Sequence, residues 1–235
     1  MVTRRGLKLF DVKTGHERRF PGDDIQPSGA VGFSPDGEIF AMRGKLWSLS
    51  SGEELVSFQN DSGVWSSVAF SSSGQIFAAS SAASIKLWDT ATGEERATLH
   101  GHEFAVTSIA FSPDGNSLAT ASEDGTVKMW SVKEGKEIVT LKDDGGPVFA
   151  LAFSPDGGTL ASAGGGGQSP SEIELWNIKL RQMHTTLKGH TDEVHSVAFS
   201  PDGRILAAAG RTLSSRYNAG EIKLWRLLGR LAGVS

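Results

Sequence analysis

The sequence of 235 residues contains no cysteine. The chain therefore has neither a disulfide framework nor a metal site built on thiolates. Since such a chain suits a reducing compartment, we expect a cytoplasmic location. No apolar run approaches the roughly 18 residues that a membrane-spanning helix needs, so we expect no membrane association.

Tyrosine and methionine are also scarce, with one and four residues, whereas 29 glycines and 12 phenylalanines are present. This composition favours short strands joined by tight turns. The net charge of −4 is uneven, because residues 1–20 hold six basic and two acidic groups and residues 204–235 hold six basic and one acidic group. If the two ends met, they would form a basic seam for a polyanion. The negative total charge argues against nucleic acid as a partner.

Two repeating patterns organise the chain. The phrase Phe-Ser-Pro-Asp-Gly, or its variant Phe-Ser-Ser-Ser-Gly, recurs at spacings of 37, 41, 42 and 46 residues. It begins at Phe33, Phe70, Phe111, Phe153 and Phe199. A second series of aromatic residues runs in phase with it and comprises Phe10, Trp47, Trp88, Trp130, Trp176 and Trp225. Two series in phase indicate a true repeat of one supersecondary unit.

Each unit reads as four short strands, which we name a to d in chain order. In the clearest copy these cover 106–112, 117–122, 126–131 and 136–141. A glycine usually marks the c-to-d turn; in the fourth complete unit Lys179-Leu180-Arg181 replaces it, which predicts a longer or strained turn.

One sheet of this size buries too little apolar surface to fold alone, so the sheets must stack. We therefore expect a single all-β domain over 1–235, a β-propeller of four-stranded antiparallel blades. About five blades are expected, plus a partial unit at 1–20 that supplies strands c and d. The other units cover 28–58, 64–99, 104–141, 147–187 and 193–235, the last without a clear fourth strand.

Ring closure stays open between three alternatives. The chain can be part of a longer propeller. It can be a degenerate ring in which residues 17–20 complete the last blade. It can also be an open arc, whose unpaired terminal strands would invite self-association.

The repeats resemble the Trp-Asp (WD) repeat family, in the style of its bacterial members. The resemblance is carried by Gly101-His102, Asp124-Gly125, Trp88-Asp89 and the Phe-Ser-Pro-Asp-Gly turns. It implies a buried, structural hydrogen-bond network, which only one unit completes, with His102, Thr120, Asp124 and Trp130. Ser122 lies on the same strand face as Thr120 and is an alternative source of the hydroxyl. We interpret this set as structural and not as a catalytic triad.

The resemblance also implies that strand a lines a central channel, where an enzyme would place its chemistry. The five expected a strands contain no Asp, Glu, Lys or Arg, and their single titratable residue is His195. One imidazole supplies neither an acid–base pair nor a metal site. We expect no enzymatic activity, no cofactor and no metal.

The b-to-c connections lengthen along the chain, whereas the other turns stay nearly uniform. Insertions in repeat proteins gather on the binding face. The longest connection, residues 210–220, holds the one tyrosine, and Tyr and Arg are frequent in interaction hot spots. The candidate partner-binding residues are Arg43, Gln168, Arg211, Arg216, Tyr217 and Asn218. A solvated insertion is the plain alternative.

We therefore expect a non-catalytic protein–protein interaction scaffold that uses the face of the b-to-c and d-to-a loops. The alternatives are an interaction or sensory segment of a larger bacterial multidomain protein, a polyanion-binding propeller, and an enzyme centred in the channel.

Overall fold

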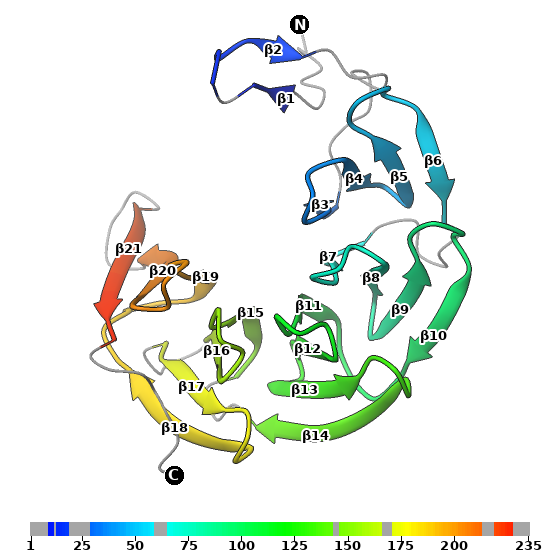
Figure 1. The fold of residues 1–235 in the computed structure, drawn as a ribbon. Coiled ribbons are helices and arrows are strands. Elements are labelled where there is room, and N and C mark those ends of the chain that lie inside the picture. Colours follow the sequence, from blue (N-terminus) through cyan, green and yellow to red (C-terminus); the bar gives the residue numbers. More distant parts are fainter. Residues whose placement is uncertain are drawn as a thin grey trace, which may run out of the picture.

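The computed structural model describes residues 9–11, 13–18, 29–58, 65–142, 146–165, 171–212 and 219–227. They form a two-stranded hairpin, four antiparallel sheets of four strands and one of three. The sheets stand as blades around a common centre, in an arc that is open on one side (Figure 1). None of the described segments is a helix long and apolar enough to cross a membrane. The prediction of an all-β protein built from propeller blades is confirmed.

The strands follow the chain order from the inner to the outer edge of each blade. The hairpin consists of β1 (Leu9–Phe10) and β2 (Glu17–Arg18). Blade 1 consists of β3 (Val31–Phe33), β4 (Ile39–Met42), β5 (Lys45–Ser48) and β6 (Glu54–Ser57). Blade 2 consists of β7 (Val68–Phe70), β8 (Ile76–Ser81), β9 (Ser84–Asp89) and β10 (Glu95–Leu99). Blade 3 consists of β11 (Val106–Phe111), β12 (Ser117–Ser122), β13 (Thr126–Ser131) and β14 (Lys136–Lys142). Blade 4 consists of β15 (Val148–Phe153), β16 (Thr159–Gly164), β17 (Ile173–Asn177) and β18 (Gln182–Leu187). Blade 5 consists of β19 (Val194–Phe199), β20 (Ile205–Thr212) and β21 (Ala219–Arg226).

The Ser-Pro-Asp-Gly segments form the a-to-b turns. In blade 3 the Ser112 hydroxyl donates to Asp114 and accepts the N–H of Ser117 at 3.0 Å. The backbone of Gly115 has a φ of 72°, a left-handed conformation that glycine adopts without strain. Ser154 in blade 4 and Ser200 in blade 5 make the same pair of bonds. The repeated phrase thus fixes the turn in each of these blades.

The apolar cores lie between blades and not within them. One cluster joins Leu87 of blade 2 to Val106 of blade 3. The next joins Met129 of blade 3 to Leu160 of blade 4, and a third joins Leu175 to Leu206 of blade 5. Each blade is therefore stabilised by its neighbours, as expected for a repeat whose single sheet is too thin to fold alone.

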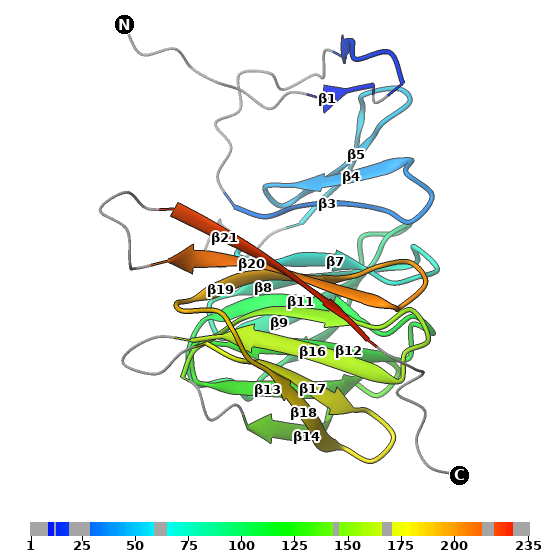
Figure 2. The same ribbon diagram turned by 90° about the vertical axis from the view of Figure 1, so that its left-hand side faces the viewer.

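One alternative for ring closure, in which residues 17–20 complete the last blade, is not formed by the described residues of this segment. Glu17–Arg18 pairs with Leu9–Phe10 and not with the last blade, because a short turn between β1 and β2 makes this pairing local. Asp11 accepts the backbone N–H groups of Lys13 and Thr14 and so stabilises that turn. Viewed towards blade 5, β21 crosses in front of the other blades and no fourth strand is described beyond it (Figure 2).

The connection expected over 210–220 is shorter in the structure. Strand pairing continues through Arg211 with Gly220 and through Thr212 with Ala219. Gly210 allows this, because a Cβ atom there would lie 2.4 Å from the carbonyl oxygen of Glu193. Only residues 213–218 separate β20 from β21.

Candidate functional site

The structure brings together the four side chains of the expected network in blade 3. His102 precedes β11, Thr120 lies on β12, Asp124 lies in the b-to-c turn and Trp130 lies on β13. Thr120 Oγ1 is 2.7 Å from His102 Nε2 and accepts the indole N–H of Trp130 at 2.8 Å. His102 Nδ1 is 2.9 Å from Asp124 Oδ2. One consistent assignment has the Thr120 hydroxyl donating to Nε2 and Nδ1–H donating to Asp124.

This assignment keeps His102 neutral. Burial lowers the pKa of His102, and the neighbouring Asp124 opposes that effect without cancelling it. Burial would raise the pKa of Asp124, but hydrogen bonds from Thr126, from the N–H of Glu103 and from His102 outweigh it and leave that pKa low. A charged Asp124 beside a neutral His102 is the resulting state near neutral pH.

The network has the residue types of a hydrolytic triad but not its accessibility. Thr120 is 0 % exposed, and its hydroxyl already contacts both His102 and Trp130. A nucleophile must reach a substrate, and this hydroxyl cannot. Ser122 does not replace Thr120 in the network, because its hydroxyl donates to the carbonyl of Phe104. The arrangement holds the segment between β10 and β11, which contains His102, against strands β12 and β13 of blade 3.

Other blades keep only parts of this network. In blade 4 the indole N–H of Trp176 donates to Ser162 at 2.8 Å. In blade 2 the position of Thr120 is taken by Ala79, and Trp88 packs instead against Phe58 with ring centroids 4.7 Å apart. Hydrophobic contact has replaced the hydrogen bonds there.

Blade 5 retains the histidine without its hydroxyl partner. His190 is 2 % exposed and lies beside Trp225, with ring centroids 5.7 Å apart. Ala208 occupies the position of Thr120. His190 Nδ1 is 3.2 Å from Glu221 Oε2, but neither ring nitrogen makes a hydrogen bond of good geometry with the described residues. Burial lowers the pKa of His190 against the effect of Glu221.

The candidate partner-binding residues are only partly placed. Arg43 is exposed in the two-residue turn between β4 and β5, where its backbone has a φ of 51°. Arg211 is exposed near the end of β20, in a strand and not in a loop. Both lie at the b-to-c end of their blades. Gln168, Arg216, Tyr217 and Asn218 lie outside the described residues.

The innermost strands carry little chemistry. As Figure 1 shows, β3, β7, β11, β15 and β19 surround the centre of the arc. His195 on β19 is exposed and its Nε2 lies 3.2 Å from Glu193 Oε2. Within the described ranges, no group of three or more His, Cys, Asp or Glu side chains could hold a metal ion.

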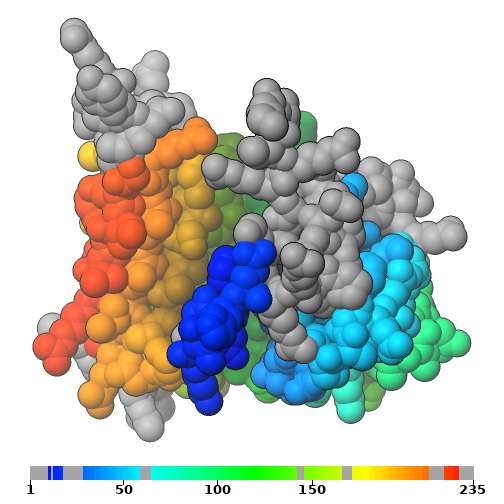
Figure 3. Space-filling view, turned by 90° about the horizontal axis from the view of Figure 1, so that it is seen from above, coloured from blue at the N-terminus to red at the C-terminus, as the bar shows by residue number. Residues whose placement is uncertain are grey.

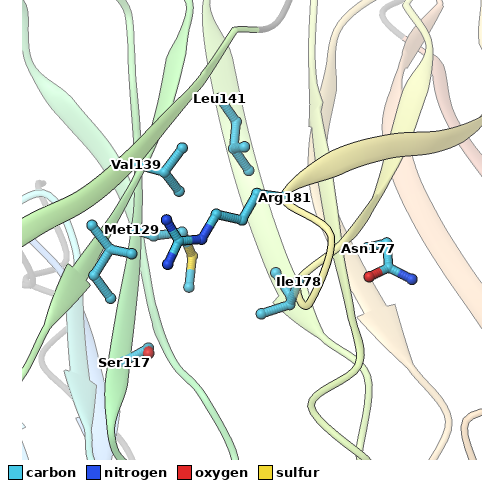
Figure 4. Close-up of a pocket in the computed structure, with 8 residues that line it drawn as sticks. Ser117, Met129, Val139, Leu141, Asn177, Ile178 and Arg181 are labelled. Atoms are coloured by element: carbon cyan, nitrogen blue, oxygen red, sulfur yellow. The ribbon is translucent and has the colours of Figure 1, made fainter. Parts of the chain in front are cut away.

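Sequence reasoning missed a small cavity between blades 3 and 4. Its volume is about 120 Å³, and Arg181 extends over it towards Met129 (Figure 4). The other lining residues are Ser117, Ile138, Val139, Leu141, Asn177 and Ile178. Arg181 has a φ of 53° where the other c-to-d turns have a left-handed glycine, so the expected strain is present. The absence of a glycine from the c-to-d turn of blade 4 was the feature of the sequence that pointed to this region.

The comparisons agree with the repeat. A family model described as WD domain, G-beta repeat matches residues 52–89, 93–131, 135–168 and 181–226. Each match starts at or just after a c-to-d turn, and three of the four end at the next strand c. No curated protein matches the chain. The matched segments cover more than half of the sequence, and the chain belongs to the WD-repeat family, whose propellers are typically non-catalytic and generally mediate protein interaction.

Proposed function

We propose that this protein is a non-catalytic interaction scaffold whose protein partner binds the face formed by the b-to-c and d-to-a connections. The observation that carries the proposal is the difference between the two faces. The five a-to-b connections all have five residues, whereas the b-to-c connections have two, two, three, eight and six. Variation on an otherwise regular repeat is typical of a binding face.

Arg43 and Arg211 supply exposed cations on this face. Arginine is enriched in hot spots because its planar guanidinium makes several hydrogen bonds and also stacks on aromatic rings. We propose that both contact the partner, together with Gln168, Arg216, Tyr217 and Asn218. The expected contribution of a hot-spot residue is about 2 kcal/mol or more.

The absence of enzymatic activity is part of the proposal. It is supported by the innermost strands, which contain no Asp, Glu, Lys or Arg, and by the burial of Thr120 within its network. We also propose a cytoplasmic location, on the absence of cysteine. The polyanion-binding and multidomain alternatives stay predictions, and most of residues 1–20 lie outside the described ranges.

A comparative affinity purification tests the face. The wild-type chain and an Arg43→Ala, Arg211→Ala, Arg216→Ala, Tyr217→Ala variant serve as baits, and bound proteins are quantified by mass spectrometry. The matched control is Lys133→Ala, Arg204→Ala, which removes exposed cations from the opposite face.

A true partner should be lost from the first variant by at least about tenfold and retained by the control. A partner that both baits retain at the wild-type level would contradict the assignment of the face.

A further inference from the structure

The c-to-d turn of blade 4 keeps an arginine at a position that favours glycine. Arg181 has a φ of 53°, a left-handed conformation that is strained for a residue with a side chain. Strain of this kind is found mostly where the side chain has a function. In the hairpin and in blades 1 to 3 the same turn position is a glycine with a φ between 63° and 75°, namely Gly15, Gly52, Gly93 and Gly135.

The Arg181 side chain lies over the cavity between blades 3 and 4. It extends from the turn towards Met129, so that the guanidinium lies at the cavity (Figure 4). The residue is exposed. None of the ion pairs between described residues includes Arg181. An unpaired cation at an apolar cavity can bind an anionic group from outside.

The equivalent groove between blades 2 and 3 has no such cation. Its arginine, Arg96, forms an ion pair with Asp89 of its own blade. Its turn position is Gly135, which has no side chain to extend. Strand pairing places Ile138 of blade 3 at the position of Arg96 in blade 2. The combination of an apolar wall and an unpaired arginine therefore distinguishes the groove between blades 3 and 4 from its neighbour.

The cavity has the size and the lining of a site for one aliphatic side chain. Its volume is about 120 Å³, and cavities of about 150 Å³ bind benzene. Met129 and Leu141 in its wall are 4 % and 5 % exposed. The hydroxyl of Ser117 also lines the cavity and takes part in none of the hydrogen bonds between described residues. Apolar walls with a few polar groups are typical of ligand sites.

A carboxylate close to a small aliphatic group matches these features. An arginine binds a carboxylate through two parallel hydrogen bonds. The C-terminal residue of a polypeptide carries its carboxylate and its side chain on the same Cα atom, so both can reach a cation that lies directly over a cavity. An internal acidic residue and its neighbour do not, because successive side chains of an extended segment point to opposite sides.

We propose that the groove between blades 3 and 4 binds the C-terminal residue of a partner polypeptide whose last side chain is aliphatic, such as leucine. Arg181 holds the carboxylate, the aliphatic side chain fills the cavity, and the Ser117 hydroxyl is available as a second donor. The site lies at the c-to-d end of blade 4, away from the variable face. Either proposal can therefore fail without the other.

The site does not depend on how the ring is completed. Blades 3 and 4 lie opposite the opening of the arc in Figure 1, and behind the β1–β2 hairpin and blade 5 in the view of Figure 3. Met129 and Leu141 belong to the apolar cluster that joins blade 3 to blade 4. The walls of the cavity are thus held by the core between these two blades.

Methyl NMR with ¹³C-labelled methionine provides a direct test, because the chain has only four methionines. Met129 lines the cavity, and Met42 is buried in blade 1 and serves as the reference. The probe is the peptide acetyl-Ala-Ala-Leu with a free carboxylate. It should shift the Met129 signal saturably, with a Kd of about 1 mM or lower, and leave the Met42 signal in place.

Matched peptides and variants separate the two parts of the site. The C-terminal amide of the same peptide and acetyl-Ala-Ala-Ala should each bind at least about tenfold more weakly, since one lacks the charge and the other lacks the aliphatic group. Arg181→Gln and Arg181→Gly should weaken the binding of the leucine peptide to a similar extent. Lys179→Ala removes an exposed cation of the same turn that does not line the cavity, and it should leave the Kd unchanged.

Three results would overturn the proposal. The first is no saturable Met129 shift at about tenfold the expected Kd. The second is wild-type affinity in Arg181→Gln, or equal affinity for the amide and the free acid. The third is binding of 4-methylpentanoate, which has the carboxylate and the branched group without a peptide bond, at least as tightly as the peptide, because the site would then take a small aliphatic acid. An unchanged Met42 signal shows that each variant is folded.

Discussion

Replacing Thr120 with valine isolates the hydroxyl that connects the network of blade 3. Valine has nearly the same shape, but it leaves the indole N–H of Trp130 and the Nε2 atom of His102 without their partner. Each buried polar group that loses its hydrogen bond costs about 1 to 3 kcal/mol, so the free energy of unfolding should fall by about 2 to 6 kcal/mol. Thr120→Ser retains the hydroxyl and removes one buried methyl group, which should cost about 0.5 to 1.5 kcal/mol.

Blade 4 supplies a matched comparison, because Ser162 accepts one N–H group and contacts no histidine. Ser162→Ala should therefore cost about 1 to 3 kcal/mol, roughly half of the Thr120→Val effect. Equilibrium unfolding in urea, followed by tryptophan fluorescence, gives the total change. Hydrogen exchange shows whether the loss is concentrated in blade 3, as expected where neighbouring repeats are only locally coupled. If Thr120→Val were no more destabilising than Ser162→Ala, the reasoning would be refuted.

Three further predictions concern stability. Burial lowers the pKa of His102 and of His190 below the ordinary 6.5 despite the nearby Asp124 and Glu221, so the unfolded chain binds more protons than the folded chain below that pH. The free energy of unfolding should therefore be highest above about pH 6.5 and fall as the pH drops towards the lowered pKa values. In thermal melts, His190→Gln should make this pH dependence weaker. Ala208→Thr would place a hydroxyl beside His190 and should raise the free energy of unfolding by about 1 kcal/mol; no gain in urea unfolding would count against it. Arg181→Gly should raise the free energy of unfolding by about 1 kcal/mol, since glycine adopts a φ of 53° without strain. The control Gly135→Ala should destabilise the protein, because the added Cβ would lie 3.1 Å from the Cβ of Ala97.

The sequence was sufficient to predict those parts of the fold in which a residue type acts only on its neighbours along the chain. Pro and Gly in the Ser-Pro-Asp-Gly segments predict the a-to-b turns, since their conformational preferences act over a few residues. The four strands expected in the clearest unit differ from the observed ones by no more than one residue at either end. The hydrogen-bonded contacts of His102 with Thr120 and Asp124 lie where the family pattern implies them.

The sequence was insufficient where a residue's role depends on its neighbour in space. Ile222 and Leu224 have the same alternation as Ile173 and Leu175, and only the presence or absence of a following blade decides their exposure. The strand that contains Glu17 can pair either with the strand of Phe10, as the structure shows, or with the last blade. The periodic pattern of the sequence does not tell which of these two pairings is more stable. Arg211 was expected in the longest b-to-c connection because the repeat spacing increases there, whereas its pairing with Gly220 extends the two strands. Glycine at such a position permits close strand approach.

Hydrogen exchange of the protein, free and bound to the partner recovered by affinity purification, tests the proposed binding face most directly. The account predicts that protection appears in the b-to-c and d-to-a connections, including Arg43 and the segment from Arg211 to Gly220. The a-to-b turns, such as residues 112–116 and 154–158, should exchange at unchanged rates. Protection confined to the a-to-b and c-to-d turns would contradict the claim that this scaffold binds through its variable face.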